Sequence, residues 1–207
     1  FTAGFPGLPA QEYEIRLPGA HQVDNAVTAL AALSLLPEDL RVSPEAARAG
    51  LREAVWPGRL EWCGNLLLDG AHNPQGVRAL REYAQSFLRD RRVAVLTGSM
   101  ADKDVAAIAE GIAAIADAVV CVSPEHMARA VPAPELCALY RGRTDKPVLA
   151  AEDTAQGLRQ AQTLAGEAGV VLVCGSLYLV GEVRRMLESS ESNLREVETE
   201  CTFCSCP

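Results

Sequence analysis

The stretch LLLDGAHNP at residues 66–74 decides how this chain is interpreted. Three leucines precede Asp-Gly, and an amphipathic segment follows Pro74. This pattern predicts a buried strand that ends in a tight turn and leads into a helix. Ligands of open α/β sheets bind at the carboxyl ends of the strands. Asp69, His72 and Asn73 are therefore candidate site residues, although Asp69 or Asn73 could instead simply cap the helix.

Short apolar runs alternate with helical segments on both sides of this turn. Strands are predicted at residues 66–68, 93–97, 118–122, 148–150 and 170–174, and helices at about 75–89, 104–115, 134–140, 154–166 and 177–188. Such alternation predicts an α/β fold, with a mostly parallel sheet that carries helices on both faces. The polar sequence after Met186 predicts a frayed helix end and a disordered tail over residues 189–207.

The first 55 residues lack this alternation. Residues 1–20 look irregular, with a short extended piece at 13–17, and residues 24–36 have a strongly helical composition. A second helix is expected from Pro44 to about residue 53, with Ser43 as its N-cap. This part is too short to be a domain of its own and is interpreted as the end of a larger one.

Composition bounds the classes of function. The chain has 207 residues, 49% of them hydrophobic, and a net charge of −8, which is typical of a globular protein without a nucleic-acid surface. No apolar run reaches the roughly 20 residues that span a bilayer, so no membrane role is expected. The odd number of cysteines, seven, and the lack of a recognisable secretory signal favour a reducing, cytoplasmic location. Cys201, Cys204 and Cys206 are interpreted as reduced thiols of the tail, and no metal site is expected in the chain.

Two polar motifs lie before the predicted sheet. His21, Gln22 and Asn25 in HQVDNA could converge at the start of the first helix, where an amide such as that of Asn25 suits an adenine edge. Asp24 could instead cap that helix. Arg59 in WPGRLE is suited to binding a phosphate, or it is simply a surface residue of a linker.

Two further motifs follow predicted strands. GSMADKD at residues 98–104 places Asp102, Lys103 and Asp104 where they could line the crevice of Asp69, unless an aspartate caps the next helix. CGSLYLVGEV at 174–183 places Ser176 at a helix N-terminus, which can bind a carboxylate. The sequence has no G-x-x-x-x-G-K-[ST] phosphate loop and no G-x-G-x-x-G after the first strand.

HQVDNA, WPGRLE, LLLDGAHNPQG, GSMADKD and CGSLYLVGEV, in this order, resemble the C-terminal part of folylpolyglutamate synthase/dihydrofolate synthase, a branch of the Mur ligase superfamily. The resemblance runs from about residue 17 to 187. It implies that residues 1–55 are the end of a central ATP-binding domain and that residues 56–188 form a Rossmann-like C-terminal glutamate-ligase domain.

The resemblance also implies an activity. Family members use ATP and Mg²⁺ to phosphorylate a folate or dihydropteroate carboxylate, and the amine of L-glutamate then attacks the acyl phosphate. Asn25 would contact adenine, Arg59 the phosphates and Asp69 the ribose. His72 and Ser176 would be associated with glutamate, and His21, Asn73, Asp102, Lys103 and Asp104 could line the cleft.

The family's phosphate loop, magnesium ligands and folate pocket have no counterpart in this sequence, so the chain is expected to be inactive alone. A monomer is expected. Two alternatives stay open: a ligase of the cell-wall branch, and a non-catalytic α/β module that binds glutamate or a nucleotide. The sequence also leaves open whether the activity is dihydrofolate synthesis, polyglutamate extension or both.

Overall fold

The structure, a computed structural model, describes residues 1–201, with side chains described as far as residue 189. The chain divides into two compact units, Phe1–Glu61 and Trp62–Pro207. This division falls slightly after the boundary expected at residues 55 and 56. Leu60 is buried, and its side chain packs close to Gly19 in the first unit.

The first unit begins with a two-stranded antiparallel hairpin of β1 (Thr2–Phe5) and β2 (Leu8–Glu12). The hairpin turns at Gly7, whose φ of 81° suits glycine. The expectation of an irregular start with an extended piece at 13–17 is therefore wrong. Pro-Gly between two short extended runs was the available hairpin signal, but the strands are too short to show clear alternation.

Helices complete this unit: α1 (His21–Ser34), the 3₁₀ turn η1 (Glu38–Leu40) and α2 (Pro44–Glu53). Ala20 occupies the N-cap of α1 without a side-chain bond, so Asp24 does not cap the helix as one alternative held. The Ser43 hydroxyl accepts from the Ala46 N–H at 3.1 Å, which confirms the predicted start of α2. The hairpin and both helices bury one apolar cluster: Leu8, Tyr13, Leu30 and Ala47.

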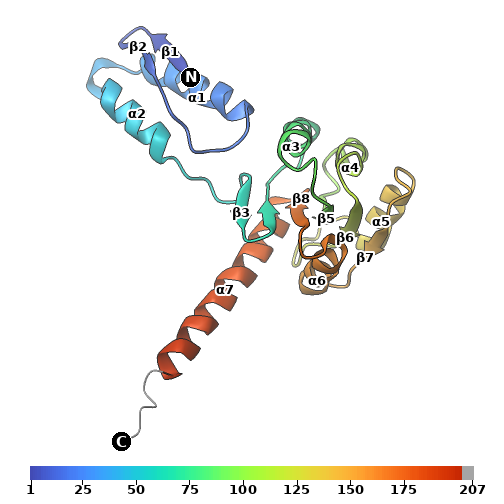
Figure 1. Ribbon diagram of the computed structural model, residues 1–207. Coiled ribbons are helices and arrows are strands. Elements are labelled where there is room, and N and C mark those ends of the chain that lie inside the picture. The colour runs from blue at the N-terminus through green and yellow to red at the C-terminus, as the bar shows by residue number, and fades with distance from the viewer. Residues whose placement is uncertain (202–207) are drawn as a thin grey trace, which may run out of the picture. The chain divides into compact units, whose positions relative to one another are not determined.

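The second unit is built on a six-stranded sheet, counted over the described residues, in the order β3-β4-β8-β5-β6-β7 (Figure 1). Its strands are β3 (Glu61–Cys63), β4 (Leu66–Leu68), β5 (Val93–Thr97), β6 (Ala118–Cys121), β7 (Val148–Ala150) and β8 (Val170–Cys174). From β4 to β7 each neighbouring pair is parallel. The mostly parallel sheet is confirmed, with the three-residue β3 as an addition that the sequence did not predict.

Helices cover both faces of this sheet. They are α3 (Pro74–Phe87), α4 (Val105–Ala113), α5 (Ala133–Arg141), α6 (Thr154–Ala165) and α7 (Leu177–Cys201). The first three lie side by side over one face, and α6 and α7 pack on the other (Figure 1). Alternate strand residues such as Leu68, Leu96 and Val173 form a core with Leu158 and Leu179 of α6 and α7. The predicted α/β class is therefore confirmed.

The last helix is longer than the sequence predicted. α7 continues to Cys201 rather than ending near residue 188, because a charged, serine-rich sequence is as compatible with an exposed helix as with a tail. The remainder of the predicted tail, with Cys204 and Cys206, lies outside the described residues. None of the helices in the described part of the chain is both long and apolar enough to cross a membrane.

One buried carboxylate connects three segments of the second unit. Glu182 of α7 is only 7% exposed. Its Oε1 accepts from the Glu125 N–H at 2.7 Å, and its Oε2 accepts from the Thr154 hydroxyl at 2.6 Å. Since a buried carboxylate requires such donors, α7, the loop after β6 and the start of α6 are held in one arrangement.

Candidate functional site

The turns that follow β4, β5 and β8 meet at the carboxyl edge of the sheet. The Gly175 N–H, after β8, donates to the Ala71 carbonyl, after β4, at 2.8 Å. The Asp69 N–H donates to the Val173 carbonyl at 2.9 Å. Because β4, β8 and β5 are neighbours in the sheet, their turns form one continuous surface where ligands of such sheets bind.

Gly175 is essential to this close approach. Its φ is 95°, which side chains with a Cβ rarely adopt. A Cβ at this position would lie 2.5 Å from both the Gly98 carbonyl oxygen and the Thr97 hydroxyl. Glycine therefore allows the turn after β8 to pack directly on the turn after β5.

A cavity of about 190 Å³ opens beside these turns. Four predicted site residues line it: His72, Asp102, Lys103 and Ser176. The remaining lining residues are Met100, Arg129, Gly175, Leu177 and Tyr178. His72 and Ser176 are about a hundred positions apart in the sequence, and the structure confirms the prediction that they face one cleft.

Ser176 and His72 have defined hydrogen-bond roles. Ser176 is 1% exposed, and its hydroxyl oxygen accepts from the Tyr178 N–H at 3.2 Å at the start of α7. His72 Nδ1 lies 2.7 Å from the Gly70 carbonyl oxygen. A carbonyl only accepts, so Nδ1 carries the hydrogen, and Nε2 of the neutral ring is left as an acceptor. The cavity thus contains a buried hydroxyl at a helix N-terminus and an imidazole acceptor.

Three charged side chains form the other part of the cavity wall. Asp102 Oδ2 lies 3.3 Å from Lys103 Nζ, and Asp102 Oδ1 lies 3.3 Å from Arg129 Nη1. Desolvation is the largest single influence on Asp102 and raises its pKa, but the hydrogen bond from Lys103 and the charges of Arg129 and Lys103 together outweigh it, so the pKa lies below its ordinary value. Sequence reasoning missed Arg129, which lies in a long loop without a recognisable motif.

Asp69 lies at the end of β4 as predicted, but it does not line this cavity. The residue is 5% exposed, and its Oδ1 accepts from the Ala71 N–H at 2.9 Å. Complete burial, and secondarily the Asp69 charge, raise the pKa of the neighbouring Cys174 thiol far above its ordinary value. Asp69 therefore shapes the turn at the end of β4.

Two candidate cleft residues cap helices instead. Asn73 Oδ1 accepts from the Gly76 N–H at 2.8 Å at the start of α3. Asp104 Oδ1 accepts from the Ala107 N–H at 3.1 Å at the start of α4. Both residues therefore fill the capping role that was the alternative, and neither lines this cavity; a place in the cleft of the full-length protein stays a prediction for both.

The remaining candidates, His21, Asn25 and Arg59, belong to the first unit. Asn25 Nδ2 donates to Gln22 Oε1 at 2.9 Å, whereas the buried Gln22 Nε2 has no hydrogen-bond partner within the described residues. The His21 ring lies beside Gly19, where a Cβ would be 2.7 Å from it. Arg59 is exposed. The start of α1 thus carries one buried amide nitrogen without a partner within the described residues, Nε2 of Gln22, next to the exposed side chain of Asn25.

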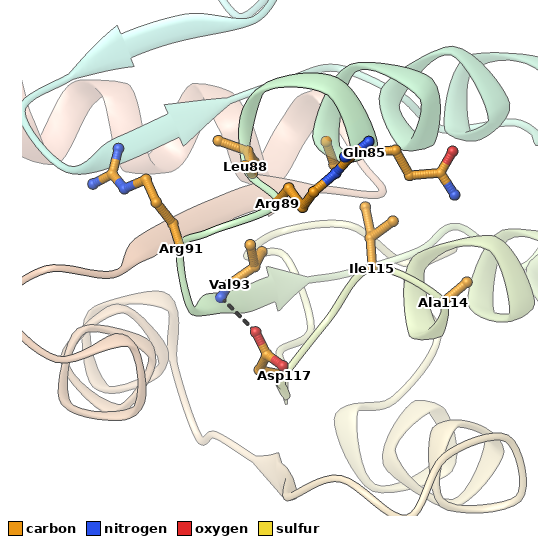
Figure 2. A pocket seen from close by; sticks show the side chains of 9 residues that line it. Gln85, Leu88, Arg89, Arg91, Val93, Ala114, Ile115 and Asp117 are labelled. Carbon is orange, nitrogen blue, oxygen red and sulfur yellow. Dashed lines mark hydrogen bonds between the residues drawn. The ribbon is translucent and has the colours of Figure 1, made fainter.

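A second hollow lies at the opposite edge of the sheet (Figure 2). Its volume is about 380 Å³, and apolar side chains such as Leu88, Val93 and Ile115 line it together with Arg89 and Asp117. The Asp117 carboxylate accepts from the Val93 N–H at 2.9 Å and pairs with Lys146 at 3.6 Å. This hollow lies at the amino ends of β5 and β6. It is therefore separate from the carboxyl edge of the sheet, where ligands of such folds bind.

No three His, Cys, Asp or Glu side chains gather closely enough to hold a metal ion among the residues that the structure describes. The three fully buried cysteines, Cys121, Cys137 and Cys174, pack as small apolar side chains. The described residues therefore do not fit a metal centre.

Comparison with known proteins identifies the family. The model of "Mur ligase, glutamate ligase domain" matches residues 58–177, which is more than half of the chain, and the chain belongs to this family. It is similar to dihydrofolate synthase/folylpolyglutamate synthase of Bacillus subtilis, with 30% identity over 86% of this chain and 42% of that protein.

Solved structures of similar proteins support this family assignment. E. coli FolC in complex with DHPP and ADP has a TM-score of 0.76 and 28% identity, covering 88% of this chain and 42% of that one. The Yersinia pestis bifunctional folylpolyglutamate synthase/dihydrofolate synthase complexed with AMPPNP and Mn ion has a TM-score of 0.69 and 31% identity, covering 89% and 42%. The chain thus spans less than half the length of these relatives.

Proposed function

We propose that this chain is the glutamate-binding part of an ATP-dependent ligase that joins L-glutamate to a folate or dihydropteroate carboxylate. The observation that carries this proposal is the cavity that brings Ser176 and His72 together with Lys103 and Arg129. A helix N-terminus with a serine hydroxyl and two cations can bind carboxylates, and an imidazole acceptor can receive a proton. The relatives, which are named as folate ligases, support the folate branch over the cell-wall branch.

Ser176 and His72 each have a proposed role in the reaction. Bound ATP would supply the phosphoryl group that activates the folate carboxylate as an acyl phosphate. Ser176 and the N-terminal N–H groups of α7 hold a carboxylate of glutamate. His72 Nε2 accepts the proton that the amine releases during its attack. The new amide bond then forms as phosphate leaves.

The nucleotide and metal contacts are proposals of the same kind. Asp69 would accept ribose hydroxyls, and Asn25, next to Gln22 with its unpartnered Nε2 within the described residues, is suited to an adenine edge. Arg59 is exposed and available for phosphates. A divalent ion, Mg²⁺ in this proposal, would be held by residues of the N-terminal part of the full-length ligase, which this chain does not include. The Mn ion of the Yersinia pestis complex supports a divalent ion. A monomer in the cytoplasm stays a prediction.

Turnover measurements test the proposal. The full-length protein that contains this segment is expected to release ADP only when glutamate and either dihydropteroate or a reduced folate are present. The 207-residue chain alone is expected to show no turnover, because its sequence carries no phosphate loop. Glutamate-dependent ADP release by the isolated chain would contradict the second expectation, and a full-length protein indifferent to glutamate would contradict the first.

Replacing Ser176 with alanine should weaken glutamate selectively. In the full-length ligase, Ser176→Ala should raise the KM for glutamate about tenfold and leave the KM for ATP unchanged, because a donor to a carboxylate is worth about 1.5 kcal/mol or more. Steady-state kinetics measure both constants. Ser176→Thr keeps the hydroxyl and should retain most of the affinity, and Ser86→Ala on the exposed surface of α3 is the matched control. Equal changes in both KM values would argue against a glutamate role.

A further inference from the structure

Arg129 is held at the cavity by its backbone and by an ion pair. The Ala101 N–H donates to the Arg129 carbonyl at 2.8 Å, and Met100 and Ala130 form an antiparallel bridge. Its side chain is 62% exposed, and Nη1 lies 3.3 Å from Oδ1 of Asp102. Neither the motifs nor the family match assigns a role to this residue, which lies beyond the helix N-terminus of α7.

Anion-binding groups thus occupy two separate parts of one cavity. Ser176 follows β8, whereas Arg129 follows β6, and β5 lies between these strands. Strands of a sheet are spaced by about 4.8 Å, so their ends are about 10 Å apart. The two carboxyl carbons of an extended glutamate are about 5 Å apart, across four bonds of about 1.5 Å. The long arginine side chain can span the remaining distance.

We infer that Arg129 binds the side-chain carboxylate of the incoming glutamate and selects for amino acids that carry one. The inference rests on the proposed function. His72 follows β4, which neighbours β8, so the reacting amine belongs at the β4–β8 side of the cavity. The α-carboxylate is attached to the same carbon as that amine and falls near Ser176. The side-chain carboxylate then extends toward β6 and Arg129.

The charges around Arg129 suit one carboxylate. Asp102 pairs with both Lys103 and Arg129, so the cluster carries a single net positive charge at neutral pH. Lys103 offers a point charge, whereas the planar guanidinium can donate two parallel hydrogen bonds to a carboxylate. Asp102 acts as a positioning residue, because its Oδ1 lies 3.3 Å from one guanidinium nitrogen of Arg129 and draws the side chain to the cavity wall.

Binding to the 207-residue chain tests the inference directly. Titration with L-glutamate and with the neutral isostere L-glutamine, followed by amide NMR spectra, gives both affinities. The unmodified chain should prefer glutamate by about tenfold or more. Arg129→Ala should lose that preference with little change for glutamine, and Arg129→Lys should recover only part of it. Arg89→Ala, with the same loss of charge at the opposite edge of the sheet, should change neither affinity.

Two results would overturn the inference, and they differ in what else they overturn. If the unmodified chain binds glutamate preferentially and Arg129→Ala keeps the preference, the role of Arg129 is wrong and the proposed function stands. If neither this chain nor the full-length protein responds to glutamate, the proposed function fails as well. In the full-length ligase, Arg129→Ala should raise the KM for glutamate about tenfold without changing the KM for ATP.

Discussion

Gly175→Ala is expected to destabilise the second unit by about 3 kcal/mol or more and to deform the cavity. The added Cβ would lie 2.5 Å from the Gly98 carbonyl and the Thr97 hydroxyl, and the φ of 95° would be strained as well. Relief of the clash requires the turns after β5 and β8 to separate, and both turns border the cavity. Urea unfolding of the 207-residue chain measures the change in free energy of unfolding.

Gly181→Ala is the matched control for this substitution. Gly181 lies in α7, only six positions further, and no atom lies within 4 Å of a Cβ built there. Alanine should therefore stabilise the helix by about 0.5–1 kcal/mol. If both variants have the same urea midpoint as the unmodified chain, the close packing of the two turns does not contribute to the free energy of unfolding, and the prediction is wrong.

Asp69→Ala in the full-length ligase is expected to raise the KM for ATP by about tenfold to a hundredfold or to abolish turnover. A carboxylate that accepts ribose hydroxyls contributes about 1–3 kcal/mol, which corresponds to this range. Asp69 Oδ1 also accepts from the Ala71 N–H, so alanine removes a turn hydrogen bond at the same time. Asp69→Asn keeps an oxygen for that bond and removes only the charge, which separates the two effects.

Asp104→Asn provides the control for the charge change. Asp104 caps α4 at the carboxyl side of β5, and asparagine caps a helix equally well. Steady-state kinetics with varied ATP should show a raised KM in Asp69→Asn and an unchanged one in Asp104→Asn. Unchanged ATP kinetics in both Asp69 variants would show that the ribose assignment is wrong.

The sequence predicted the sheet well because its strands are continuous apolar runs. The runs at 66–68, 93–97, 148–150 and 170–174 match β4, β5, β7 and β8, and only β6 ends one residue earlier than expected. A parallel strand buried on both faces gives such a run, which is readable without knowledge of its neighbours. The N-terminal hairpin and β3 escaped prediction because their sequences, TAGF, LPAQE and EWC, are not continuous apolar runs and are too short to show alternation.

Site residues were predictable where they immediately follow a strand. His72 and Ser176 line one cavity because the carboxyl ends of parallel strands meet at one edge. Asn73 and Asp104 share that position, but their short side chains are used for capping, and the sequence is equally compatible with both roles. Arg129 lies in the middle of a long loop, and only tertiary hydrogen bonds bring it to the cavity.

The buried Glu182 carboxylate connects two segments that border the pocket. It holds the loop that leads to Arg129 through the Glu125 N–H, and it belongs to the same helix whose first turn follows Ser176. The distance between Ser176 and Arg129 is thus set when the chain folds, before a ligand binds. Ordering a loop on ligand binding costs roughly 1–2 kcal/mol per backbone residue, and here that cost is met in advance. The pocket would then select amino acids by the length of their side chain, because the distance between Ser176 and Arg129 depends on Glu182, which does not line the pocket.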